Sequence, residues 1–370
     1  NHVCSEQICR LVEDYKLESL DDLAEEIISR SERSLRESIA KVPAGHYASE
    51  GIIEQMEGHA PVTIKCDVTI EGSDIIIDLT GSSPQVEWGG NVVYNFTYAY
   101  VHMAVKSIFD PELPNTHGTA APIKLIAPEG SVVNCKFPAA VVARMQIGHF
   151  LTEIIYRALA PVLADRVVAG CGGTPATMQV FYGSRANGET FHTALIRGGG
   201  MGAGATTDGV GSFVFPANGA NTPVEIFESD TPLMIRCREL IPDSGGAGKH
   251  RGGLGRREII EIPNGADAPR GAVSLAIQSG RFQLAPEGLF GGGNGKLATF
   301  QVNGQTGNPY GLTRLRAGDV VELSGGGGGG FGPPAERDPE ALARDVAGGR
   351  VTAEHARSEY GVRIEGTSAS

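Results

Sequence analysis

The chain contains 370 residues, of which 41% are hydrophobic, and 43 acidic against 31 basic side chains give it a formal net charge of −12. This excess of negative charge argues against a surface for nucleic acid or for anionic membranes, and no apolar run reaches the roughly 20 residues that span a bilayer. The length suits two or three domains. Six scattered cysteines without a CxxC pair indicate free thiols in a reducing cytoplasm.

The amino-terminal part of the chain predicts helices followed by strands. Residues 3–16 are expected to be helical, and apolar residues recur at helical spacing over 19–42, until Pro43 and Gly45 end the pattern. The period then changes, and three strands are expected over 46–56, 62–70 and 74–80. The last of these alternates as a half-exposed antiparallel strand does. A loop over 81–90 and a helix over 92–109 follow.

The next stretch, residues 110–144, combines rigid turns with one short strand. Its sequence is DPELPNTHGTAAPIKLIAPEGSVVNCKFPAAVVAR. Five prolines fix φ and push the residues before them toward extended conformations, while Ile123, Leu125 and Ile126 predict a buried strand. So many turn residues around so little regular structure indicate a shaped loop, and such loops often line sites. A structural crossover without chemistry fits the same pattern.

This stretch resembles the hydantoinase B/oxoprolinase family, in which the corresponding pattern is DPxxPNN-G---PI-V-APEG-VVNP-PPAAV. Here Thr116 follows Asn115 where the family has a second Asn, and Cys135 replaces a Pro. The resemblance extends over nearly the whole chain. It also implies a longer protein, because family members carry a further amino-terminal part with a His/Asp metal motif, whereas this sequence starts at Asn1.

The remainder of the chain predicts further helices, a hairpin and glycine-rich loops. A helix is expected over 150–164, hairpin strands over 178–182 and 190–197, strand-rich sequence beyond about 230, and two tail helices over 339–346 and 352–360. We therefore expect a helical segment over 1–45, a central α+β domain over 46–230, a strand-rich domain over 231–337 and a helical tail over 338–370. The predicted fold class is α+β, with mixed, largely antiparallel sheets, a few packed helices and glycine-rich loops.

The glycine clusters do not form a nucleotide-binding motif. A phosphate loop needs GxxxxGK followed by Ser or Thr, but His250 follows Lys249 and Leu297 follows Lys296. Residues 200–205 match the loose dinucleotide pattern, yet no amphipathic helix follows them. The sequence also lacks a GxSxG elbow, an HExxH pair and the Cys and His spacing of structural zinc. We therefore expect this chain alone to bind neither ATP nor a stoichiometric metal.

Two polar regions provide candidate site residues. Asn115 and Arg144 bracket the shaped loop, and a guanidinium at the end of an apolar run would need a partner if it were buried, either an anionic ligand or a structural carboxylate. Asp208, Asn221 and Glu225 belong to a region that matches a GG-GA----DG…NTPVE run of the family. Glu225 and Asp208 are therefore predicted to be catalytic, and Asn115, Arg144 and Asn221 to bind substrate. Turn capping is the alternative for Glu225.

A third region, DSGGAGKHRGGLG at 243–255, is the most family-specific motif of the chain. Its charged residues, together with those that follow it, are expected to form a charged turn: Asp243, Arg251, Arg256 and Arg257. Its many glycines predict a role in backbone shape.

The resemblance also implies a function. The chain would be the carboxyl-terminal part of the B-type subunit of an ATP-dependent cyclic amidase, such as a hydantoinase, oxoprolinase or lactamase. An A-type, kinase-like partner would bind ATP and Mg and phosphorylate the substrate carbonyl oxygen. Hydrolysis would then use a divalent metal held by the amino-terminal part, present in the same protein or as a separate B fragment. The alternatives are a subunit of an ATP-dependent ketone carboxylase of the acetone or acetophenone type, and a non-catalytic scaffold.

Overall fold

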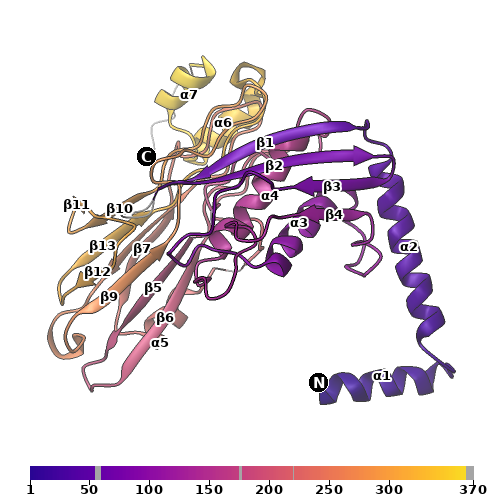
Figure 1. Ribbon diagram of the computed structural model, residues 1–370. Coiled ribbons are helices and arrows are strands. Elements are labelled where there is room, and N and C mark those ends of the chain that lie inside the picture. The colour runs from indigo at the N-terminus through magenta and orange to yellow at the C-terminus, as the bar shows by residue number, and fades with distance from the viewer. Residues whose placement is uncertain (55–59, 175–176, 220, 364–370) are drawn as a thin grey trace.

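The computed structural model describes residues 1–54, 60–174, 177–219 and 221–363, and Figure 1 shows its helices and sheets. Helices and largely antiparallel sheets alternate with glycine-rich loops, so the predicted α+β fold class is confirmed. None of the helices in these ranges is long and apolar enough to cross a bilayer.

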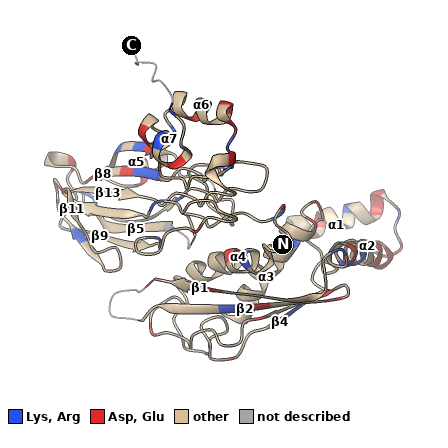
Figure 2. Cartoon of the chain, turned by 90° about the horizontal axis from the view of Figure 1, so that it is seen from above, with Lys and Arg blue, Asp and Glu red and all other residues tan. Residues whose placement is uncertain are grey.

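The amino-terminal helices form an arm that projects from the rest of the molecule (Figure 1). Helix α1 (His2–Asp14) has no buried residue, whereas α2 (Asp21–Ile39) buries Leu35 and Ile39 near its carboxyl end. The hydroxyl of Ser19 accepts a hydrogen bond of 2.8 Å from the backbone of Asp21, which satisfies one free donor of the first turn of α2. The arm is rich in charged residues (Figure 2), as expected for helices that are exposed to water.

The first sheet carries the shaped loop and two packed helices. Its order is β1 (Gly45–Ile53), β2 (Val62–Glu71), β3 (Asp74–Asp78) and β4 (Ile123–Ile126), and only β3 and β4 are parallel. Parallel neighbours need a long crossover, and α3 (Tyr94–Phe109) with the proline-rich loop supplies it. The predicted strand over 46–56 is described only as far as residue 54.

Helix α4 (Met145–Leu159) packs on α3 and on β1 and β2. The expected start at residue 150 was wrong, because Gln146, Gly148 and His149 interrupt the apolar pattern and yet are buried in the core. The amino-terminal turns of α4 therefore depend on tertiary packing, which a sequence period does not reveal.

Two further sheets enclose a second core. The predicted hairpin, β5 (Thr177–Ser184) and β6 (Thr190–Arg197), is confirmed, and it joins β9 (Val273–Gln278) and β12 (Thr313–Leu315) in the order β12-β9-β5-β6. The other sheet has the order β11-β10-β13-β8-β7, with bounds Gln305–Thr306, Thr299–Val302, Val320–Ser324, Arg256–Glu261 and Met234–Leu240. Helix α5 (Val224–Asp230) places Phe227 in this core. Pairing of β5 with β9 joins the two sides of the boundary expected near residue 230.

Glycine-rich segments form a tightly packed unit that we call the glycine bundle. Segments 169–173, 198–204, 244–255 and 286–295 surround residues 325–330 and exchange backbone hydrogen bonds with them, such as Gly200 to Gly326 at 2.9 Å and Gly246 to Gly328 at 2.8 Å. A Cβ atom added at Gly327 would lie 1.7 Å from the carbonyl oxygen of Ser244. As at the axis of collagen, only glycine lets backbones approach so closely. The predicted role of the glycines of 243–255 in backbone shape is confirmed.

The predicted tail helices are also confirmed, as α6 (Pro339–Ala347) and α7 (Ala353–Tyr360). They lie over the glycine bundle, where Leu342, Ala356 and Tyr360 pack with Ala247. Two short 3-10 turns, Gly265–Asp267 and Pro334–Glu336, complete the described elements.

Candidate functional site

Arg144 precedes α4 and lies at the surface. Its Nη1 donates to the carbonyl oxygen of Val141 at 3.3 Å, and its Cζ lies 5.4 Å from the centroid of the Phe96 ring. No carboxylate of the described residues forms an ion pair with it. Because its side chain is exposed, water solvates the charge at little cost, and the guanidinium fork remains available to an anion.

Helix α4 buries a stripe of polar side chains. Gln146, His149 and Glu153 recur at positions i, i+3 and i+7, so they share one face of the helix, and they are 2%, 2% and 4% exposed. Glu153 is well paired, because its two oxygens accept from Nη2 of Arg281 at 2.8 and 2.7 Å and one of them from the backbone of Cys171 at 3.2 Å.

Gln146 and His149 lack such partners. Neither ring nitrogen of His149 and neither side-chain polar atom of Gln146 has a hydrogen-bond partner among the described residues. Burial lowers the pKa of His149 to about 4, so its imidazole is neutral near pH 7. Unsatisfied polar groups in a core are rare and often mark a site that holds a ligand or water.

Aromatic rings connect these buried groups to Arg144. The ring centroids of His149 and Tyr100 lie 5.5 Å apart, and those of Tyr100 and Phe96 lie 5.0 Å apart. Together with Arg144 and Gln146, these residues form what we call the Arg144 patch. Gly148 permits the contact, because a Cβ there would lie 2.6 Å from the Phe96 ring.

The Arg144 patch joins a surface cation to neutral hydrogen-bonding groups. The guanidinium can hold an anionic oxygen, while a neutral imidazole and an amide can each donate and accept hydrogen bonds. This combination suits a small ligand with one charged group and one amide. The sequence singled out Arg144 but missed Gln146 and His149, although polar residues three positions apart in an apolar helix are the signal that could have found them.

Asn115 lies exposed in the shaped loop. No hydrogen bond joins its side chain to Arg144 within the described residues. The loop itself is fixed from the side of α3, since Nε2 of His102 lies 2.9 Å from the hydroxyl of Thr119. Asn115 therefore belongs to the same loop as Arg144 but not to the contacts that form the patch.

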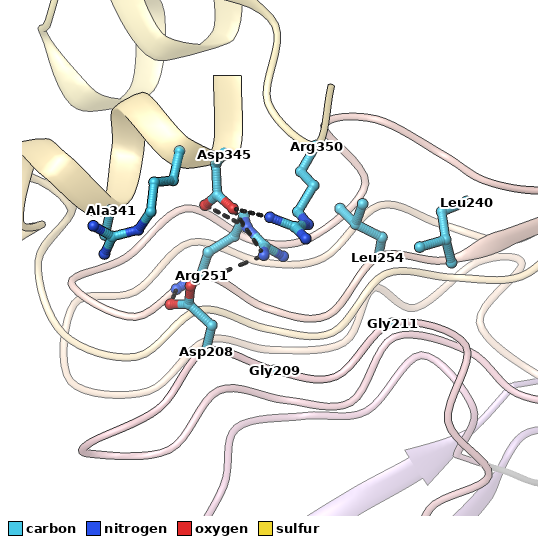
Figure 3. A pocket seen from close by; sticks show the side chains of 10 residues that line it. Asp208, Gly209, Gly211, Leu240, Arg251, Leu254, Ala341, Asp345 and Arg350 are labelled. Atoms are coloured by element: carbon cyan, nitrogen blue, oxygen red, sulfur yellow. Dashed lines mark hydrogen bonds and ion pairs between the residues drawn. The ribbon is translucent and has the colours of Figure 1, made fainter. Parts of the chain in front are cut away.

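Asp208 lies in a charged network beside a cavity of about 350 Å³ (Figure 3). Its oxygens accept from both terminal nitrogens of Arg337 at 2.9 Å and from the backbone of Arg251 at 2.7 Å. Arg251 also pairs with Asp345 of α6 at 3.0 Å. Burial acts to raise the pKa of Asp208, but the hydrogen bonds and charge of Arg337 outweigh it, so the pKa lies below its ordinary value. These contacts favour an anchor for the tail over a proton acceptor.

Glu225 and Asn221 lie at the start of α5 and just before it. Glu225 is exposed in the first turn. The amide oxygen of Asn221 accepts from Nη1 of Arg256, and its nitrogen donates to the carbonyl oxygen of Ser212 at 3.3 Å. The structure thus brings Asn221 to Arg256, which the sequence assigned only to a charged turn, and leaves Asp208, Glu225 and Asn221 without direct contact among their described side chains.

The donor set does not fit the divalent metal that the family resemblance implies. Among the residues that the structure describes, no three His, Cys, Asp or Glu side chains lie close enough together to hold a metal ion. His149 is the histidine of the Arg144 patch, and its neighbours there are aromatic and amide groups.

Comparison with known proteins gives a family and a fold. Residues 1–334 match the hydantoinase B/oxoprolinase family. The B-type subunit of a putative D-/L-hydantoinase from Pseudomonas sp. (strain NS671) is 30% identical over 97% of this chain and 62% of its own length. The beta subunit of the caprolactamase from Pseudomonas jessenii is 27% identical over 97% of this chain and 64% of its own.

Solved structures show the same fold. The ATP-dependent caprolactamase of Pseudomonas jessenii has a TM-score of 0.86 at 23% identity, covering 100% of this chain and 65% of that one. An acetone carboxylase in its nucleotide-free form has a TM-score of 0.84 at 20% identity, covering 99% of this chain and 56% of that one. The chain thus spans less than two thirds of the length of these proteins.

Proposed function

The chain belongs to the hydantoinase B/oxoprolinase family, and from that membership we propose that it is part of the B-type subunit of an ATP-dependent cyclic amidase. The observation that supports this is the similarity of 97% of the chain to the B-type subunit of a hydantoinase and to the beta subunit of a caprolactamase. In this proposal an A-type, kinase-like partner binds ATP and Mg and phosphorylates the carbonyl oxygen of a ring amide. An amide is a poor electrophile, and phosphorylation of its oxygen makes the carbon open to attack.

The Arg144 patch is the part of this chain that we assign to the substrate. Arg144 would hold a negatively charged oxygen with its planar fork, and Gln146 and His149 would form hydrogen bonds with the uncharged amide, whose desolvation would otherwise cost free energy. Asn115 and Asn221 are proposed as further substrate contacts. Of the two carboxylates predicted to be catalytic, Glu225 is the one without competing donors from an arginine, so we propose it as the proton acceptor.

The proposal also includes a metal and a cellular location. We assign the divalent metal that would activate water to a polypeptide segment outside this chain, which is either a further part of the same protein or a separate B fragment. The complex is placed in the cytoplasm, where the free cysteines would remain reduced.

The test uses the complex that copurifies with this chain. Hydantoin, 5-oxoproline and caprolactam are each incubated with ATP, and ring-opened product and ADP are measured. We expect ring opening that requires ATP and this chain and does not require bicarbonate. Consumption of acetone or acetophenone that requires bicarbonate, without ring opening, would replace the amidase by a carboxylase. Full activity in a complex from which this chain has been omitted would leave it a scaffold.

A further inference from the structure

Three arginines surround one carboxylate between the two sheets of the second core. Arg197 ends β6, Arg238 lies in β7, and Arg256 and Glu258 lie in β8. Arg197 Nε, Arg238 Nε and Arg256 Nη2 lie 2.8, 2.6 and 3.2 Å from oxygens of Glu258. We call these four residues the arginine cluster. Arg197, Arg256 and Glu258 are 1%, 3% and 0% exposed.

The charges of the arginine cluster do not balance. Three guanidinium cations share a single carboxylate, and no second carboxylate of the described residues pairs with any of them. The arginine cluster therefore has a net charge of two positive units in a largely buried environment. An isolated buried charge is costly, so an excess of two is a strong departure from the usual pairing. Burial lowers the pKa of Arg197 to about 10, so its guanidinium remains charged near neutral pH, and burial also lowers the pKa of Arg256.

Neutral acceptors satisfy Arg197 but not the other two arginines. Nη2 of Arg197 donates to the carbonyl oxygens of Arg256 and Leu323 at 2.8 and 3.0 Å. In contrast, Nε and Nη2 of Arg256 and Nη2 of Arg238 are buried and have no hydrogen-bond partner among the described residues, and the contact of Arg256 Nη2 with Glu258 at 3.2 Å is an ion pair only. An unsatisfied buried donor is destabilising, and one that belongs to a charged group more so.

The two arginines that carry the unsatisfied donors lie on adjacent strands, and one of them is partly exposed. In the register of β7 and β8, Arg238 lies opposite Glu258 and Leu240 lies opposite Arg256, so the two arginines are diagonal neighbours on adjacent strands. Nη1 of Arg238 donates to the carbonyl oxygen of Thr222 at 2.7 Å, and Nη1 of Arg256 to the exposed Asn221. The side chain of Arg238 is 18% exposed, so the cluster can be reached beside Asn221 and Thr222.

We infer that the arginine cluster is a binding site for a phosphoryl dianion, held between Arg238 and Arg256. A phosphoryl group carries about two negative charges near neutral pH, which matches the two uncompensated charges, whereas a carboxylate would neutralise only one. Its several acceptor oxygens also match the three unsatisfied donors of Arg238 and Arg256, and arginine forks suit this geometry. No contact among the described residues joins the cluster to the Arg144 patch, so this is a second anion site.

The source of the phosphoryl group depends on the proposed function, but its binding does not. In an ATP-dependent amidase, inorganic phosphate is a product, and an acyl phosphate or an O-phosphorylated imidate is an intermediate. Both present the same dianion. Phosphate binding can therefore be measured without ATP, a partner subunit or turnover. Absence of phosphate binding would not affect the result of the ring-opening assay, and absence of ring opening would not affect the result of the binding measurement.

The experiment measures thermal stabilisation of the chain and calorimetric binding at constant ionic strength. The probes are inorganic phosphate, acetyl phosphate, acetate and chloride. We expect saturable stabilisation by phosphate that exceeds the effects of acetate and chloride, and that weakens as pH falls and phosphate becomes a monoanion. Arg238→Gln is expected to weaken phosphate affinity tenfold or more. Tighter binding of acetyl phosphate than of phosphate would identify an acylated ligand, and equal binding would identify free phosphate.

Two further variants make the result decisive. Arg236→Gln removes the same charge from the same strand, at a side chain that is 51% exposed and paired with Glu261, and should keep phosphate affinity within twofold. Arg238→Lys keeps the charge, so it should fold even if Arg238→Gln does not. Its single ammonium nitrogen cannot replace the planar guanidinium fork, so it should still lose several-fold in affinity. Equal stabilisation by chloride and phosphate, or wild-type affinity in Arg238→Lys, would overturn the inference. Equal binding of acetate would overturn the assignment to a dianion.

Discussion

Gly328→Ala tests whether the glycine bundle is held by close backbone contact. A Cβ at Gly328 would lie 2.0 Å from the carbonyl oxygen of Met201, roughly 1 Å or more inside any ordinary van der Waals contact. The backbone of segment 198–204 or of 325–330 must move by about that distance. Overpacking of this kind typically costs about 1–3 kcal/mol.

The movement would also disturb backbone hydrogen bonds. Gly328 donates to Gly253 at 2.9 Å and accepts from Gly246 at 2.8 Å, and each is worth about 1 kcal/mol net. The expected loss in the free energy of unfolding is therefore about 3–5 kcal/mol, or about 4–6 °C in Tm for a chain of this size. Urea unfolding and thermal melts of the purified chain measure it.

Gly325→Ala provides the matched control in the same glycine run. Both glycines are buried, and neither has a positive φ, but the nearest atom to a Cβ at Gly325 is the carbonyl oxygen of Gly198 at 3.6 Å. This variant should be neutral or slightly stabilised, by up to about 1 kcal/mol, because alanine restricts the unfolded chain. If the free energies of unfolding of Gly328→Ala and Gly325→Ala differ by less than about 1 kcal/mol, close backbone packing does not stabilise the glycine bundle and the explanation is wrong.

Two other predictions concern buried charge and buried histidine. Arg281→Met leaves the buried Glu153 with one remaining cation among the described residues, Arg157 at 3.3 Å, and with the backbone N–H of Cys171 at 3.2 Å. It should lower the free energy of unfolding by about 3–5 kcal/mol, measured by urea unfolding, and the double variant with Glu153→Gln should recover most of that loss. Equal losses in the single and the double variant would show that the pair itself is not the cause. For His149, the pKa is lowered to about 4 in the folded chain, while in the unfolded chain it is about 6.5, so the unfolded state binds the proton first. Stability should therefore fall as pH drops from about 6.5 to about 4, by up to about 3 kcal/mol, and His149→Leu should show a smaller loss over that interval; the same pH dependence in both proteins would assign it to other groups.

Local periodicity predicted much of the fold. Alternation in 74–80 and in the hairpin at 178–197 gave strands that the structure contains as β3, β5 and β6, since side chains that alternate between a core and water leave a period of two. The tail helices were equally visible, with Asp338 and Thr352 as their capping residues. These features depend on neighbours within a few residues, which a single sequence displays.

The remaining features depend on contacts between distant segments. Glycine clusters were evident, but the sequence does not tell that residues 325–330 pack against four other segments. The arginine cluster joins Arg197 to Glu258 and Arg238 across two sheets, so its imbalance of charge appears only when the strands are paired. Likewise, Asp208 was predicted to be catalytic from a motif, while its contacts with Arg337 come from a residue far along the chain.

Arg144 shows how the structure changes the prediction made from sequence. An apolar run before it suggested burial, and a buried guanidinium would require a partner; the exposed side chain needs none. The one hydrogen bond that its side chain forms with the described residues, to Val141 at 3.3 Å, is long. The free energies of unfolding of Arg144→Ala and Arg144→Lys should therefore both lie within about 1 kcal/mol of the wild-type value. A change in turnover can then be assigned to the ligand and not to the fold.

The expected loss of turnover follows from the guanidinium fork. In the assembled complex, Arg144→Ala should lower kcat/KM by about 10–100-fold, as expected for loss of a hydrogen bond between charged groups, and Arg144→Lys should recover only part of it because one ammonium cannot replace two planar donors. Arg33→Ala, which removes an exposed charge from α2, is the control and should leave turnover unchanged. Unchanged turnover in both Arg144 variants would remove Arg144 from the site. A parallel loss of stability and turnover in Arg144→Ala, rescued by lysine, would instead give it a structural role.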